Sequence, residues 1–158
     1  MARAGAGKRT AKQAGKRTGK RAVSIPKVTP TMKRIVKRVS TRPTARMETF
    51  PNPKKGRDYE IEMEYPEFTC LCPLTGQPDF ATIRISYIPH EVCVELKSLR
   101  NYLWSYRNQG AFHEAVTNRI ADDLIRLMQP RWLEVEGEFH VRGGVTTTVR
   151  VSHSALEE

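Results

Sequence analysis

The fold of this chain is decided by the stretch Tyr59-Glu60-Ile61-Glu62-Met63-Glu64-Tyr65. Apolar and acidic side chains alternate through it with a period of two, which is typical of a β-strand with one buried face and one face in water. A second alternating segment follows, with Ile83, Ile85 and Tyr87 as its apolar residues, and Pro89 interrupts it near its end. The two segments predict neighbouring strands that are joined by the loop between them.

Helical spacing replaces this alternation in the middle of the chain. Apolar residues that recur three or four positions apart predict a first helix from Glu95 to about Tyr106. The same spacing predicts a second helix from about Phe112 to Met128, since Pro130 prevents its continuation.

Alternation returns in the last part of the chain and completes the predicted fold. A third strand is indicated by the apolar residues Leu133, Val135, Phe139 and Val141. The pair Gly143-Gly144 fits a tight hairpin turn into a fourth strand from Val145 to Val151. The order β-β-α-α-β-β predicts an α+β fold, with a four-stranded antiparallel sheet that carries both helices on one face. Because such a sheet leaves two edge strands, we expect subunits to join there in a ring-like homo-oligomer with sites between subunits.

Charge divides the chain into two parts. Residues 1–50 hold 15 of the 27 Lys and Arg residues but only one acid, Glu48, whereas the whole chain carries a net charge of +10. We therefore expect residues 1–50 to form a basic, disordered tail and residues 51–158 to form the folded domain. Such a tail would contact RNA or another polyanion, act only as a solubility segment, or resemble an organelle transit peptide, and the sequence leaves these alternatives open.

Cysteine usage and hydropathy indicate the compartment. The chain has three cysteines, and its N-terminus lacks the apolar stretch of a secretory signal, so we expect reduced thiols and a cytoplasmic protein. No run of residues approaches the ~20 apolar residues of a membrane span.

The loop after the first strand holds the candidates for chemistry. It reads Phe68-Thr69-Cys70-Leu71-Cys72-Pro73-Leu74-Thr75-Gly76-Gln77-Pro78-Asp79. Prolines and a glycine between Cys72 and Asp79 favour turns, which bring the thiol and the carboxyl group to one pocket. A thiolate is a nucleophile and a carboxylic acid is a proton donor, so the pair fits covalent catalysis. The alternative is a surface loop with two small buried cysteines.

Three segments carry a resemblance to a known family. They are the stretch 68–81, the stretch Val94-Glu95-Leu96-Lys97-Ser98-Leu99-Arg100, and Phe112-His113-Glu114. Together they closely resemble the 7-cyano-7-deazaguanine reductases, the nitrile reductases of tRNA queuosine biosynthesis, in their short single-domain form. The resemblance covers about Pro51 to Arg150. It implies the tunnelling fold, or T-fold, in which subunits form barrels and pack as a decamer of two pentamers.

The resemblance also implies an oxidoreductase and a role for each residue. Cys72 would add to the substrate nitrile to form a thioimide, Asp79 would donate protons, and NADPH would supply two hydrides to reach 7-aminomethyl-7-deazaguanine. Substrate binding would fall to Val94, Glu95, Leu96, His113 and Glu114. The phosphates of NADPH would be held by Lys97 and Arg100, whose cationic groups suit phosphate, and no metal would take part. Cys70 would be a bystander.

Two alternatives from other classes remain open at this point. A zinc-dependent GTP cyclohydrolase-like enzyme of the same fold would use Cys70 or Cys72, Cys93 and His113 as ligands, although their spacing is poor for a zinc site. An RNA-binding module would act through the basic tail, but this leaves the Cys, Asp and Glu residues of the domain unexplained.

Overall fold

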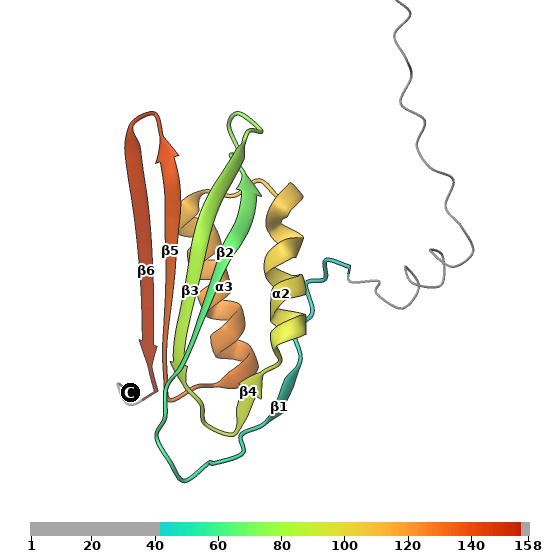
Figure 1. Ribbon diagram of the computed structural model, residues 1–158, viewed down its shortest axis with the longest axis vertical. Coiled ribbons are helices and arrows are strands. Elements are labelled where there is room, and N and C mark those ends of the chain that lie inside the picture. The colour runs from blue at the N-terminus through green and yellow to red at the C-terminus, as the bar shows by residue number, and fades with distance from the viewer. Residues whose placement is uncertain (1–41, 156–158) are drawn as a thin grey trace, which may run out of the picture. The chain divides into compact units, whose positions relative to one another are not determined.

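The computed structural model describes residues 42–155 (Figure 1), and the predicted disorder of the chain up to residue 41 lies outside this range. The elements are β1 (Thr49–Pro51), β2 (Ile61–Leu71), β3 (Pro78–Ile88), β4 (Val92–Val94), α2 (Leu96–Trp104), the 3-10 helix η1 (Ser105–Asn108), α3 (His113–Met128), β5 (Trp132–Arg142) and β6 (Val145–Ser154). The predicted β-β-α-α-β-β order is confirmed. The short strands β1 and β4, which pair with each other, were not predicted.

The main sheet is antiparallel, with strand order β2-β3-β5-β6. Alternating residues of β3 and β5, among them Ile83 and Val135, are fully buried on one face. Residues of α2 and of α3 join the same core cluster, so both helices cover that face, as the sequence predicts. Gly137 lets α3 approach β5, because a Cβ atom at this position would lie 2.7 Å from the Thr117 Oγ1 atom.

The strand β2 differs from its predicted outline. It begins at Ile61 and continues to Leu71, past Pro66, which the alternating pattern did not include. Its register against β3 shifts between Tyr65 and Phe68. Proline cannot donate a ladder hydrogen bond, so its place at a bulge of an edge strand is the one that a sheet tolerates.

The folded part begins before the boundary expected at residue 51. Met47 packs against the core, and the Thr44 backbone N–H donates to the Asn101 carbonyl group at 3.2 Å. The Glu48 backbone N–H donates to Ser98 Oγ at 2.9 Å. The charge pattern placed the boundary too late because it measures composition, whereas these contacts depend on single residues that dock on α2.

The two ends of the main sheet hold different parts of the chain (Figure 1). We call one the hairpin end: it holds the β2–β3 loop (residues 72–77), the start of α3 and the β5–β6 turn at Gly143-Gly144. We call the other the α2-start end: it holds β1, β4 and the first turn of α2. The 11 residues of β3 run between them, a length of about 35 Å at roughly 3.3 Å per residue. This separation decides which predicted site residues can meet within one chain.

Candidate active site

Cys72 lies in a closed loop at the hairpin end. Its backbone N–H donates to the Gln77 carbonyl group at 2.8 Å, and the Gly76 N–H donates back to the Cys72 carbonyl group at 2.8 Å. Gly76 has a φ of +69°, in the left-handed region that glycine adopts without strain. The turn residues recognised in the sequence therefore close the loop upon Cys72 itself.

The loop directs hydrogen-bond donors at the Cys72 sulfur. The Thr75 hydroxyl group is the strongest of them, and the backbone N–H groups of Leu74 and Thr75 add to it. These bonds, with a smaller contribution from the Arg142 cation, lower the pKa of the Cys72 thiol from 9.0 to about 7. About half of the Cys72 side chains are then ionised at neutral pH. The structure gives Cys72 the reactivity that nucleophilic catalysis needs.

Cys70 has the opposite environment. It is fully buried, and this burial, together with the nearby Asp79 and Cys72, raises its pKa to about 11. Its sulfur lies 4.0 Å from the Ala111 carbonyl oxygen. A thiol of this kind stays protonated near neutral pH, so its environment fits the bystander role expected for it.

Asp79 lies beside the loop and is 8% exposed. Its Oδ1 atom accepts a hydrogen bond from Arg142 Nη1 at 2.6 Å, and its Oδ2 atom lies 3.5 Å from His113 Nε2. The His113 ring stacks on Phe139, with 3.8 Å between ring centroids. Cys72, Asp79 and His113 thus gather at one end of the sheet, and Glu114 follows in the exposed first turn of α3.

Arg142 is a functional candidate that the sequence analysis missed. Period-two alternation puts Val141 inside and Arg142 outside, but Val141 is 63% exposed. The register of β5 against β6 shifts between Phe139 and Arg142, where β5 has one extra residue. One extra residue reverses the faces of the residues that follow it. The Gly143-Gly144 turn was visible in the sequence, but this bulge was not.

The second group of predicted residues lies at the α2-start end. Glu95 caps α2: its Oε1 and Oε2 atoms accept from the backbone N–H groups of Lys97 at 2.9 Å and Ser98 at 2.7 Å. These bonds lower the pKa of Glu95. Val94 is buried, and its N–H donates to the Tyr87 hydroxyl group at 3.3 Å. Leu96, in contrast, is 65% exposed.

The two cations assigned to cofactor phosphates line different cavities. Lys97 lines one of about 210 Å³ with Arg46 and Glu95. Arg100 lines one of about 270 Å³ with Trp104 and Arg107. Within residues 42–155 neither Lys97 nor Arg100 forms an ion pair. Cations with an adjacent indole ring fit the phosphates and base of a dinucleotide such as NADPH.

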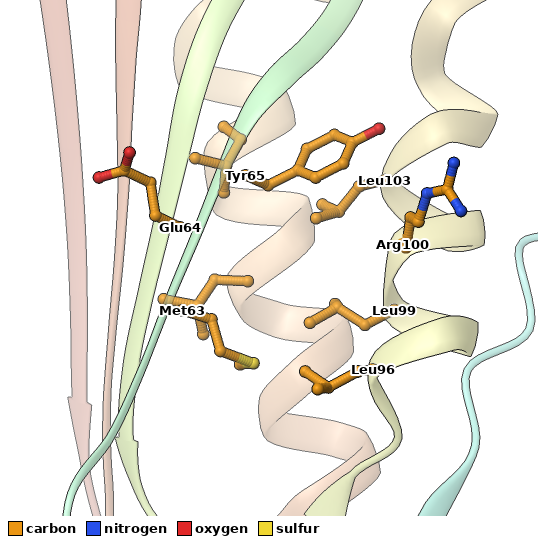
Figure 2. Close-up of a pocket in the computed structure, with 9 residues that line it drawn as sticks. Met63, Glu64, Tyr65, Leu96, Leu99, Arg100 and Leu103 are labelled. Carbon is orange, nitrogen blue, oxygen red and sulfur yellow. The ribbon is translucent and has the colours of Figure 1, made fainter.

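A third cavity, of about 170 Å³, lies between β2 and α2 (Figure 2). Leu96, Leu99 and Leu103 reach into it from α2, and Met63 faces them from β2, while the guanidinium group of Arg100 turns away (Figure 2). None of the thiol, carboxyl or imidazole groups of the hairpin end lines it. This cavity is therefore apolar and lies apart from the Cys72 chemistry.

Comparison with known proteins places the chain in a family. The family model described as QueF-like protein matches residues 78–158. The NADPH-dependent 7-cyano-7-deazaguanine reductase of Anaeromyxobacter sp. (strain K) is 66% identical over 113 residues, which are 72% of this chain and 93% of that protein. The protein of the same name from Alkalilimnicola ehrlichii is 61% identical over 115 residues, 73% of this chain and 89% of that protein.

This chain belongs to the QueF-like family.

The fold of this QueF-like protein agrees with a solved structure. The archaeosine synthase QueF-Like, in its apo form, superposes with a TM-score of 0.55 at 16% sequence identity, over 63% of this chain and 95% of the other. At this identity the likeness concerns the fold alone. The predicted T-fold is confirmed.

The zinc alternative does not find its ligands together in the QueF-like chain. Cys93 lies at the α2-start end, where its sulfur is 3.8 Å from the Tyr59 hydroxyl group, whereas His113 lies at the hairpin end. Among the described residues, no group of three or more His, Cys, Asp or Glu side chains is arranged to hold a metal ion. Nor is any helix of the described part long and apolar enough to cross a membrane.

Proposed function

We propose that this protein reduces the nitrile group of 7-cyano-7-deazaguanine to the aminomethyl group of 7-aminomethyl-7-deazaguanine, with NADPH, in the biosynthesis of the queuosine of tRNA. Relatives of 58–66% identity bear the name of this NADPH-dependent reductase. The observation that carries the proposal is the Cys72 loop, whose donors lower the pKa of the thiol to about 7 beside Asp79 and His113. Nitrile carbon is a weak electrophile, and it needs both a thiolate and a proton donor.

Cys72 opens the reaction. Its sulfur forms a bond to the nitrile carbon, one electron pair of the carbon–nitrogen triple bond moves to the nitrogen, and the nitrogen takes a proton from Asp79. The product of this step is a thioimide. NADPH, when bound, supplies the hydride that each of the two reductions adds at this carbon. The carbon–sulfur bond breaks between the two hydride additions, which returns Cys72 as a thiolate and leaves an imine, whose nitrogen takes a second proton as the second hydride reaches the carbon.

We assign substrate binding to Val94, Glu95, Leu96, His113 and Glu114. Each oxygen of Glu95 accepts one backbone N–H bond within the cap of α2. A carboxylate oxygen can accept more than one hydrogen bond, so Glu95 keeps capacity for the N–H groups of a guanine-like ring. His113 and Glu114 lie at the end of the sheet where Cys72 would attack.

Lys97 and Arg100 are the proposed phosphate contacts of NADPH. Replacement of both by Ala is expected to raise the KM for NADPH at least tenfold, because two cations are lost, while adduct formation on Cys72 without cofactor continues. Arg126→Ala, which removes an exposed cation of α3 that pairs with Asp123, is the matched control. Equal losses in both reactions would count against the assignment.

The active site needs a second copy of the chain. Cys72, Asp79 and His113 lie at the hairpin end, and Glu95 and Lys97 lie at the α2-start end, separated by roughly the length of a strand of about 35 Å. A purine-sized substrate cannot bridge that distance. The free edges of β2 and β6 offer a route for chains to join, so we propose a homo-oligomer with composite sites. For this homo-oligomer we propose the decamer of two pentamers that the resemblance implies.

Mixed oligomers test the composite site directly. Cys72→Ala and Glu95→Ala chains are each expected to form inactive homo-oligomers. After co-expression in equal amounts, about a quarter of the sites should combine an intact Cys72 from one chain with an intact Glu95 from its neighbour, and activity should return in proportion. Lys97→Ala serves as a second partner, in case Glu95→Ala destabilises the helix cap. If oligomers shown by sedimentation to contain both chains stay inactive, the site does not cross between chains.

The function itself is tested with purified protein. On mixing with 7-cyano-7-deazaguanine and no cofactor, intact-protein mass spectrometry should show one covalent adduct, which NADPH then discharges with oxidation of two NADPH per substrate. Cys70→Ala should form the adduct, and Cys72→Ala should not. An adduct on Cys72→Ala protein would overturn the mechanism, and so would one mapped to Cys70 or Cys93.

We place the enzyme in the cytoplasm, which suits a tRNA-modification pathway. For the basic residues 1–50 we propose a weak polyanion contact that falls steeply with salt, as phosphate attraction does. Retention of RNA by the full chain at 50 mM salt, lost on deletion of residues 1–41, is the expected result. If the full chain and the deletion protein bind RNA equally, the basic tail does not contact RNA.

A further inference from the structure

One side chain ties the Cys72 loop to Asp79. Nη2 of Arg142 donates to Thr75 Oγ1 at 2.8 Å and to Gln77 Oε1 at 3.2 Å, while its Nη1 donates to Asp79 Oδ1 at 2.6 Å. A planar guanidinium group can make these bonds together because its donors point in fixed, divergent directions. Lysine could supply the charge but not this geometry.

The strand that carries Arg142 is built to present it. Asp79 has the same parity along β3 as the buried residues Ala81 and Ile83, so it faces the helices. Regular alternation from the buried Phe139 would turn Arg142 toward the opposite face. The extra residue of β5 between Phe139 and Arg142 reverses that direction and lets Arg142 reach Asp79.

We propose that Arg142 is a positioning residue, which orients the Thr75 hydroxyl group toward the Cys72 sulfur and fixes which oxygen of Asp79 carries the proton. The inference rests on the roles proposed above for Cys72 and Asp79. It deepens them by assigning their common support to one residue that neither the sequence motifs nor the resemblance included.

The Thr75 hydroxyl group shows the first effect. Its oxygen accepts from Arg142 Nη2 at 2.8 Å and from the Gln77 backbone N–H at 3.3 Å. A hydroxyl oxygen has two acceptor sites and one hydrogen, so with both acceptor sites occupied the hydrogen is left to point at the Cys72 sulfur. A cation that donates to the oxygen also polarises the O–H bond and strengthens its donation. Arg142 therefore acts on Cys72 chiefly through Thr75.

Asp79 shows the second effect. Arginine has donors only, and the Asp79 Oδ1 atom that receives Arg142 Nη1 accepts better when it carries no proton. The arrangement therefore favours Oδ2 for the proton that Asp79 delivers, and this oxygen lies 3.5 Å from His113 Nε2. The His113 imidazole, at this distance from that oxygen, can exchange a proton with it.

The test measures Cys72 reactivity without substrate or cofactor. The rate of Cys72 alkylation by iodoacetamide is followed against pH by peptide mass spectrometry, with folding checked by circular dichroism. The other titratable and charged groups at this end include Cys70, Asp79, Arg142, the His113-Glu114 pair of α3 and His140 of β5. Arg142→Gln is expected to move the alkylation profile to higher pH, so that a rise of one unit leaves the rate at pH 7 about fivefold lower. Arg150→Gln, on the neighbouring strand β6, should keep the wild-type profile.

Three further variants separate positioning from a merely structural role. Thr75→Val should shift the profile in the same direction, and the double variant should lose little more than Thr75→Val alone, because Arg142 acts through the lost hydroxyl group. Arg142→Lys should fall between wild type and Arg142→Gln. A folded Arg142→Gln protein with the wild-type alkylation profile would overturn the proposal, as would additive losses in the double variant. A raised KM for NADPH with an unchanged profile would instead make Arg142 a cofactor contact. Alkylation by iodoacetamide needs no substrate, so the role of Arg142 can be tested even if the protein lacks the proposed reductase activity.

Discussion

Adduct formation on Cys72 should follow the ionisation of a thiol with a pKa of about 7. The thiolate fraction is then about one tenth at pH 6, one half at pH 7 and nine tenths at pH 8. We therefore predict that the rate of thioimide formation rises roughly tenfold from pH 6 to pH 8 and levels off above it. A thiol at the ordinary value of 9.0 would have only about one hundredth of its population ionised at pH 7. The Cys72 loop thus raises the reactive fraction at neutral pH about fiftyfold.

The measurement is rapid mixing of the protein with 7-cyano-7-deazaguanine, without NADPH, across this pH range. Thioimide formation also depends on substrate binding, so iodoacetamide alkylation of Cys72 is run in parallel, because it follows the thiolate without substrate. Both profiles should share a midpoint near pH 7. An alkylation rate that still climbs about fivefold between pH 8 and pH 9, as a thiol at the ordinary pKa of 9.0 would, refutes the reasoning, since it would mean that the donors of the loop do not stabilise the thiolate.

Three further predictions test other parts of the structure. Asp79→Asn keeps the size of the side chain but cannot donate its proton, so adduct formation measured by mass spectrometry should slow about 10²–10⁴-fold while substrate still binds. Gly137→Ala places a methyl group 2.7 Å from Thr117 Oγ1 and should lower the free energy of unfolding by about 1–3 kcal/mol in urea titrations, whereas Gly56→Ala, with no atom within 4 Å of its Cβ, should change it little. Deletion of residues 1–41 should leave a folded, active enzyme by circular dichroism and turnover, and loss of either would show that this segment supports the core.

Periodicity in the sequence was sufficient for the long elements of the fold. Eleven-residue strands and a 16-residue helix repeat their pattern often enough to identify it, and α3 ends where Pro130 requires. The strands β1 and β4 have three residues each, and three residues are too few to show an alternating pattern. Helical spacing likewise paired Lys97 with Arg100 as neighbours three positions apart. Three positions leave the two side chains about 60° apart around the helix axis, and in the structure each of them lines a different cavity.

The site was predictable where chemistry resides in a local motif and not where it depends on tertiary geometry. Cys72 and Asp79 lie at the two ends of a turn-rich segment, so the sequence could place them together, although Asp79 belongs to β3 in the structure. The sequence distinguished Cys72 as the nucleophile from Cys70 as the bystander only through the resemblance. The pKa values of the two thiols differ because hydrogen-bond donors surround the Cys72 sulfur, whereas burial surrounds the Cys70 sulfur, and neither feature is visible in the sequence. Arg142 is 70 residues from Cys72 in the chain, and it reaches the loop only because one extra residue in β5 reverses its direction. A bulge of this kind leaves the apolar pattern of the strand almost unchanged, and for that reason a residue expected to face outward became the one that connects nucleophile and acid.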